Sequence, residues 1–172
     1  MKSLKKAFTR EDGSATIEFV ILFPAIMTLF LSAFEVGIYL TRSVMLDRAV
    51  DLNVRLLRLG ALEPATQEEL KRRICDDALI FRGCPDAILV ELREISTEDW
   101  QLPEANIACV DRDAEVQPSV DFNFGRRNEV MLVRACAVLD PFFGSTPFVM
   151  ELPQDATGAH MITAMSTFVN EP

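Results

Sequence analysis

The chain has 172 residues, of which 49% are hydrophobic and 25% charged, a composition that excludes a disordered protein. The formal net charge is −9, and an acidic chain argues against nucleic acid as a partner, because phosphate binding needs clustered Lys and Arg. The length suits one modest domain together with a membrane segment.

The first 13 residues form a short basic leader that ends in Gly13. Ser14 follows, then the lone carboxylate of Glu18 with Phe19, and no charged residue occurs from Phe19 to Phe34. A buried charge at the start of an apolar segment is expensive and usually functional. This order of residues resembles a prepilin cleavage site between Gly13 and Ser14, followed by a pilin membrane helix, and it indicates assembly rather than catalysis.

The apolar run predicts a membrane helix over 14–40. Its segment 17–40 covers about 36 Å as a helix, enough for a bilayer core of about 30 Å. Pro24 lies inside it, either as a harmless kink or as a site of tilting when subunits pack. Glu35 is expected to reach towards the membrane interface or to cap a helix contact, and Gly37 admits another helix closely.

The helical pattern continues without interruption over 41–60 and ends at Gly60, so we expect one helix from about residue 15 to residue 59. A second helix is predicted after Thr66, which forms a capping box with Glu69. Its apolar face is Leu70, Ile74, Ala78 and Phe81, and it is expected to end at 83–85.

Alternating and continuous apolar runs then predict strands. Their ranges are 87–95, 107–110, 129–139 and 162–169. Loops are expected at 96–106, 111–125, 141–147 and 152–158. The predicted fold is α+β, with helices on one face of a small antiparallel sheet. The domain organisation follows as a leader at 1–13, a transmembrane helix at 14–40, its periplasmic extension at 41–60 and a periplasmic domain at 61–172.

Four cysteines, an even number, lie in the part expected outside the inner membrane, where the compartment is oxidising. They are Cys75, Cys84, Cys109 and Cys136. Three pairings are possible, and we favour Cys75–Cys84 as a local clamp and Cys109–Cys136 as a link between strands. The intervals do not fit a paired zinc motif.

The sequence gives little support for a catalytic or metal-binding site. His160 is the only histidine and has no nucleophile-elbow motif to serve, so we interpret it as a surface residue. The acidic segment 111–115 lacks the glycine and the length of a calcium loop and is interpreted as a solvated loop. No catalytic residue, metal or cofactor is therefore predicted.

Four stretches resemble the TadE-like family of the tight-adherence (Tad, or Flp) pilus system. They are the motif Gly13-x4-Glu18-Phe19 with Pro24, the segment 34–37 with the helix to 60, the segment 122–134, and the tail 163–172. The resemblance implies a minor pilin or pseudopilin that is needed for pilus assembly, adhesion and biofilm formation. TadE and its relative TadF are not distinguished.

The same resemblance implies that a prepilin peptidase cuts after Gly13 and that the mature subunit begins at Ser14. Glu18 is then expected to pair with the Ser14 amine of a neighbouring subunit. A pair within one chain and a position in the headgroup region without a partner are the alternatives for Glu18. Phe19 stands in the place where major pilins usually have tyrosine. The implied partners are other Tad pilins and minor pilins, the peptidase, the inner-membrane platform and the lipid bilayer.

The implied location is the bacterial inner membrane, with one span, a cytoplasmic N-terminus and a periplasmic C-terminal domain. Two alternatives stay open from the sequence. One is an uncleaved, membrane-anchored interaction protein, and the other is a secreted domain that signal peptidase releases.

Overall fold

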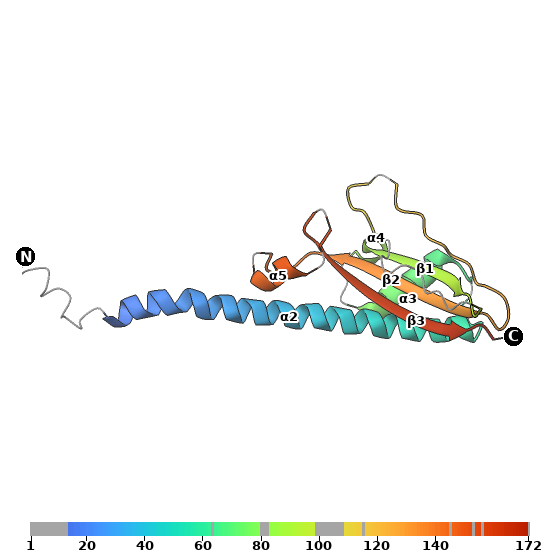
Figure 1. Cartoon of the computed structure of the whole chain (residues 1–172), viewed down its shortest axis with the longest axis horizontal. Helices are drawn as coiled ribbons and strands as arrows, with labels where there is room; N and C mark the ends of the chain where they lie inside the picture. The colour runs from blue at the N-terminus through green and yellow to red at the C-terminus, as the bar shows by residue number, and fades with distance from the viewer. Residues whose placement is uncertain are drawn as a thin grey trace, which may run out of the picture.

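The computed structural model describes residues 14–62, 64–79, 83–98, 109–114, 116–144, 146–152, 154–155 and 157–171. One long helix, α2 (Ser14–Arg58), carries a smaller α+β unit along its second half (Figure 1). The other elements are α3 (Gln67–Ala78), α4 (Cys84–Ala87), β1 (Ile88–Ile95), β2 (Val130–Leu139), α5 (Pro147–Glu151) and β3 (His160–Val169). We call the elements after α2, together with the second half of α2, the head.

Helix α2 is continuous over 45 residues, as the sequence predicted, and it passes through Pro24 without ending. Its termination also follows the prediction, because Gly60 has a positive φ of 63°. The Gly60 and Ala61 N–H groups donate to the carbonyls of Leu57 and Leu56, which satisfies the last turn.

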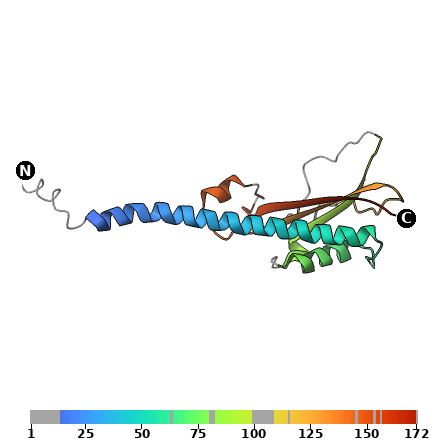
Figure 2. The ribbon, with the colours of Figure 1, turned by 90° about the horizontal axis from the view of Figure 1, so that it is seen from below.

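The strands form an antiparallel sheet in the order β1-β2-β3. The register pairs Val90 with Ala135 and Ala135 with Ala164, so these residues share one face. That face packs against α2 and α3, which Figure 2 shows beside the sheet. One buried cluster joins these five elements. The expected α+β layout, with helices on one face of a small antiparallel sheet, is confirmed.

Helix α3 begins as predicted, because the Thr66 hydroxyl accepts a hydrogen bond from the Glu69 N–H at 3.2 Å. The Glu69 carboxylate binds Arg72 and Arg73, each at 2.7 Å. Hydrogen bonds from these two guanidinium groups lower the pKa of Glu69 to about 2. The expected end at 83–85 was wrong, since α3 ends at Ala78 and the separate short helix α4 begins at Cys84.

Two disulfides cross-link the head. Cys75–Cys84 joins α3 to α4, and Cys109–Cys136 joins the segment 109–114 to β2. This is the pairing favoured from the sequence. Cys109 and Val110 are not part of a strand, contrary to expectation, and residues 107 and 108 lie outside the described residues. Gly13, the rest of the leader and Phe81 also lie outside them.

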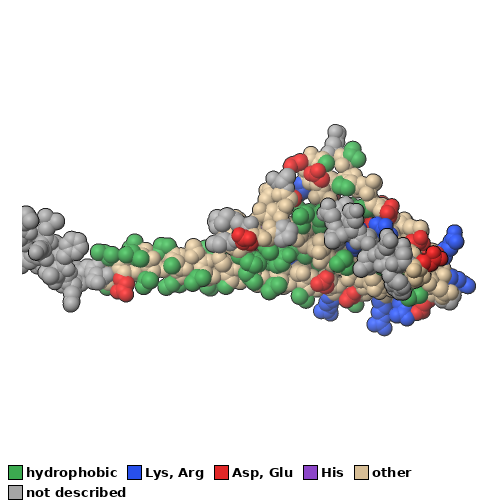
Figure 3. Space-filling view, in the orientation of Figure 1, with side chains coloured by type: hydrophobic (Ala, Val, Ile, Leu, Met, Phe, Trp, Pro, Cys, Tyr) green, Lys and Arg blue, Asp and Glu red, His purple; other side chains and the backbone are tan. Residues whose placement is uncertain are grey.

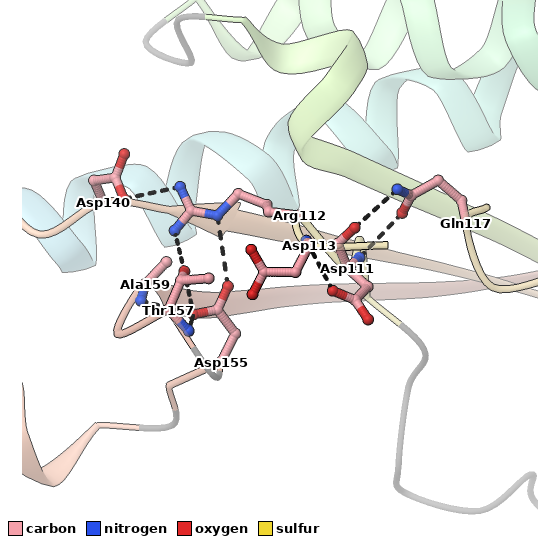
Figure 4. A network of polar contacts seen from close by, with 8 residues as sticks. All are labelled: Asp111, Arg112, Asp113, Gln117, Asp140, Asp155, Thr157 and Ala159. Atoms are coloured by element: carbon pink, nitrogen blue, oxygen red, sulfur yellow. Dashed lines mark hydrogen bonds and ion pairs between the residues drawn. The ribbon is translucent and has the colours of Figure 1, made fainter. Parts of the chain in front are cut away.

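The acidic segment after Cys109 is fixed to the head through Arg112 (Figure 4). The Arg112 guanidinium donates to Asp140 at 2.9 Å and to the Thr157 hydroxyl at 2.7 Å, and it lies 3.5 Å from Asp155. Burial alone would raise the pKa of Asp155, but hydrogen bonds from Thr157 and Ala159 and the charge of Arg112 together lower it. The segment is therefore an exposed, solvated loop, as expected, which Arg112 fixes to the rest of the head.

Candidate functional site

The first part of α2 extends beyond the head with apolar side chains exposed along its length. We call residues 15–34 the free stretch. Ten large hydrophobic residues in it are between 47% and 73% exposed. They are Ile17, Phe19, Val20, Ile21, Leu22, Phe23, Ile26, Leu29, Phe30 and Phe34. Figure 3 shows hydrophobic side chains along this stretch and charged side chains gathered on the head.

The length of the free stretch matches a bilayer. Twenty helical residues span about 30 Å, the thickness of a typical hydrocarbon core. The described residues contain one helix, beginning at Ala15, that is long and apolar enough to cross a membrane by length and composition. A helix that is apolar all round needs lipid or other helices around it. The finding is consistent with a membrane anchor or a signal segment.

Glu18 is the one charged residue of the free stretch and is exposed. It lies four residues after Ser14, the first residue of α2, so the two positions share a helix face. The rings of Phe19 and Phe23, which face each other across one turn, have centroids 5.2 Å apart. This end of α2 therefore presents a carboxylate beside aromatic surface, with the Gly13 position outside the described residues.

Glu35 marks the junction between the free stretch and the head. It is only 1% exposed, and its carboxylate accepts hydrogen bonds from the backbone N–H groups of Phe142 at 2.9 Å and Phe143 at 2.8 Å. The structure thus differs from the expectation that Glu35 reaches towards the interface. A loop of the same chain supplies the hydrogen-bond donors for this carboxylate, and the carboxylate is the acceptor for two backbone N–H groups of that loop.

The Phe residues of this loop pack around α2. The Phe34 ring meets Phe142 and Phe143 edge-on, at centroid distances of 6.1 Å and 5.9 Å. Helix α5 follows, and its Phe148 ring lies 6.3 Å from Tyr39. The loop 141–147 was expected from the sequence, but its docking and the helix after it were missed. Two adjacent phenylalanines in a turn, opposite a carboxylate in an apolar helix, were the available signal.

His160 lies on the other side of Tyr39, with ring centroids 6.2 Å apart. The expectation of a surface histidine was wrong, since His160 is 3% exposed and pairs with Leu139 on the core face of the sheet. Among the described residues, neither ring nitrogen has a hydrogen-bond partner. Burial lowers the pKa of His160, with a raising effect from Glu35 and a further lowering effect from Arg42.

Gly37 borders an open groove. Apart from its chain neighbours and the backbone of its own helix, no described atom lies within 4 Å of the place where a Cβ would be. The groove has a volume of about 560 Å³ and is lined by Ala33, Phe34, Gly37, Ile38, Thr41, Arg42 and Phe142. Space for close approach of another molecule thus exists where the sequence suggested a packing position.

A long apolar N-terminal helix, followed by a short helix and a three-stranded antiparallel sheet, is a pilin-like arrangement. Residues 13–51 match the family described as TadE-like protein. The matched segment covers the free stretch, the junction at Glu35 and the first buried turns of α2. No curated protein and no solved structure matches the chain.

The match over residues 13–51 implies a protein associated with the Tad pilus and suggests components of that pilus as partners. The family is generally non-enzymatic. Within the described residues, no group of three or more His, Cys, Asp or Glu side chains is placed to hold a metal ion.

Proposed function

We propose that this protein is a minor pilin or pseudopilin of the Tad pilus machine, and that it supports pilus assembly, adhesion and biofilm formation. One observation carries the proposal. The segment that matches the TadE-like family includes the free stretch of α2, which is mainly apolar and exposed along most of its length. Such a surface is built to be covered by lipid before assembly and by other helices after it.

In this proposal, a prepilin peptidase cuts between Gly13 and Ser14, and α2 spans the inner membrane with the head in the periplasm. The basic leader favours this orientation because positive residues stay on the cytoplasmic side. The disulfides of the head fit an oxidising compartment outside the inner membrane.

Glu18 directs assembly in this proposal. Cleavage creates a positive amine at Ser14, and the Glu18 carboxylate of a neighbouring subunit pairs with it as helices stack. In surroundings of low dielectric, such a pair strongly favours one axial register. Phe19 and Pro24 shape the same packing surface. A pair within one chain is the competing arrangement, since Ser14 and Glu18 lie one turn apart on α2.

The presence of the head favours the role of a minor pilin over that of the main filament subunit. A bulky α+β unit covers the second half of α2, and subunits that carry it cannot pack as bare helices along that half. Other Tad pilins and minor pilins, the prepilin peptidase and the inner-membrane platform are the proposed partners.

The N-terminus of the protein tests this proposal. The intact mass and N-terminal sequence of protein from bacterial membranes are measured in strains with and without the Tad prepilin peptidase. A start at Ser14 that depends on the peptidase supports the pilin pathway. A start at Met1 in both strains indicates an uncleaved anchor, and a start beyond Phe34 indicates a secreted domain, so either result overturns the proposal.

A further inference from the structure

The loop that Glu35 holds carries a pair of aromatic residues beside α2, of which Phe142 is exposed and Phe143 is half-buried. We call Phe142 and Phe143 the aromatic tip. Although the Phe142 ring touches Phe34 and Phe143, it remains 64% exposed. Phe34, against which both rings pack, is itself 47% exposed. A single exposed phenylalanine is ordinary, but three in contact form a continuous apolar patch.

The height of the aromatic tip along α2 is fixed by the two hydrogen bonds to Glu35. Ile17 lies 18 residues before Glu35, which is about 27 Å along a helix axis. If the free stretch fills a hydrocarbon core of about 30 Å, the tip therefore lies where the core ends and the headgroups begin. This step depends on the membrane span that forms part of the proposed function.

The groove beside Gly37 continues from the tip in the direction of the head. Its walls are mainly apolar, and Arg42 lines it at the end furthest from the free stretch. Arg42 lies eight residues after Phe34, about 12 Å further along the helix axis. This order of groups matches that of a bilayer surface. The apolar and aromatic groups lie at the level of the acyl chains, and the cation lies beyond them at the level of the phosphates.

We propose that the aromatic tip inserts into the outer surface of the bilayer that α2 crosses, with lipid acyl chains against Phe142 and phosphates near Arg42. The head then touches the membrane at two places, the helix and the tip. With two contacts the head cannot tilt relative to the membrane, whereas with the helix alone it could. Lipid is the partner that fits because the patch is continuous with the apolar surface of the free stretch.

Tryptophan reporters in the full chain test the inference. Trp100 is the only tryptophan and is first replaced by phenylalanine. Three variants then carry one tryptophan each, Leu22→Trp in the free stretch, Phe142→Trp at the tip and Val116→Trp on the head, where Val116 is 82% exposed. Each is reconstituted in vesicles of phosphatidylcholine and phosphatidylglycerol with brominated acyl chains, and emission is compared with vesicles without bromine.

We expect bromine to quench the Leu22→Trp and Phe142→Trp variants and to leave Val116→Trp unchanged, while aqueous acrylamide quenches only Val116→Trp strongly. If Leu22→Trp is quenched but Phe142→Trp behaves like Val116→Trp, the tip is in water and the inference is overturned. If Phe142→Trp is shielded from both quenchers, protein covers the tip and the inference is again overturned. If Leu22→Trp escapes bromine, the membrane span itself fails, which separates the two proposals.

A second reporter guards against a disturbed tip. Gly144 is exposed in the same turn, and a Cβ there would meet only Pro141 at 3.8 Å, an ordinary contact. Gly144→Trp therefore leaves both phenylalanines in place. Its quenching by brominated lipid is expected to follow that of Phe142→Trp, and its quenching by acrylamide alone would overturn the inference.

Discussion

At the scale of single residues, Glu18 and Glu35 are the acidic side chains on the first half of α2, and their surroundings are opposite. Glu35 is buried and receives two backbone N–H groups, whereas Glu18 is exposed on the free stretch. A satisfied carboxylate is suited to hold structure, and an exposed one in an apolar helix is suited to meet a partner.

Glu18→Ala is expected to leave cleavage after Gly13 intact and to reduce pilus assembly strongly, because the register-setting pair is lost. Thr16→Ala, two residues earlier on the same exposed stretch, is the control and is expected to assemble normally. Pili counted by electron microscopy, with the N-terminus checked by mass spectrometry, provide the measurement. Normal piliation in the Glu18→Ala strain would contradict the pairing.

Glu35→Ala is expected to lower the free energy of unfolding by about 1–3 kcal/mol, because two backbone donors of the loop lose their acceptor. Glu35→Gln keeps one acceptor oxygen and is expected to lose less. Urea unfolding of the full chain in detergent measures both, with Glu151→Ala, an exposed position on α5, as the control. Equal stability of Glu35→Ala and Glu151→Ala would show that the two hydrogen bonds contribute nothing.

His160 gives the head a pH dependence. Its pKa is lowered by burial from the ordinary value of 6.5, so below this value the unfolded chain binds a proton that the folded chain does not. The contribution of His160 to the free energy of unfolding is therefore fully present above pH 6.5. It declines as the pH falls from there towards the lowered pKa of the folded protein. Tyr39, Glu35 and Arg42 are the groups that face or influence the ring.

His160→Phe keeps an aromatic ring against Tyr39 and removes the titrating group, so it is expected to flatten this decline. The free energy of unfolding is measured for both proteins between about pH 7.5 and about pH 5.5, a window in which histidine changes charge. Carboxylates that titrate in the same window affect both proteins alike. An identical slope in the two proteins would rule out His160 as the source.

At the scale of elements, the two disulfides close loops of different size, with sequence separations of 9 and 27 residues. If they act by restricting the unfolded chain, the short loop contributes about 2.5 kcal/mol and the long loop about 3.5 kcal/mol. The variant Cys109→Ser with Cys136→Ser should therefore be less stable than the variant Cys75→Ser with Cys84→Ser. Urea unfolding compares them, and the reverse order would refute the entropic explanation.

The sequence was sufficient for elements whose pattern is local. Continuous or alternating apolar runs located β1 and β2 to within a residue, and the capping chemistry of Thr66 and Gly60 located two helix ends. Helix α5 has only five residues, and its position depends on packing against Tyr39, a residue more than a hundred positions earlier. No local pattern contains such a contact.

The same limit explains the site. The sequence predicted the apolar free stretch of α2 and its one charged residue, Glu18, because hydropathy and charge are local properties. The burial of Glu35 and His160 was not, since each is buried by a distant segment: the loop after β2 covers Glu35, and the pairing of β3 with Leu139 turns His160 inwards. Glu35 and His160 thus look exposed in the sequence but are buried by segments far along the chain.

At the scale of the whole molecule, the charged side chains gather on the head and the apolar ones along the free stretch (Figure 3). The proposed topology places the C-terminal end in the periplasm. Alkaline phosphatase fused after residue 172 is therefore expected to be active, because the enzyme needs an oxidising compartment to form its disulfides. Green fluorescent protein at the same position, exported through the same route, is expected to be dark. An inactive phosphatase with a bright fluorescent fusion would reverse the topology.

Helix α2 has no joint between its free stretch and the part buried in the head, since it runs unbroken from Ser14 to Arg58. Each residue of a helix turns by about 100° and rises by about 1.5 Å. A partner that grips the free stretch one residue further along would thus rotate the entire head by about 100° while raising it by about 1.5 Å. The depth at which the free stretch is held therefore sets the direction in which the head faces its neighbours.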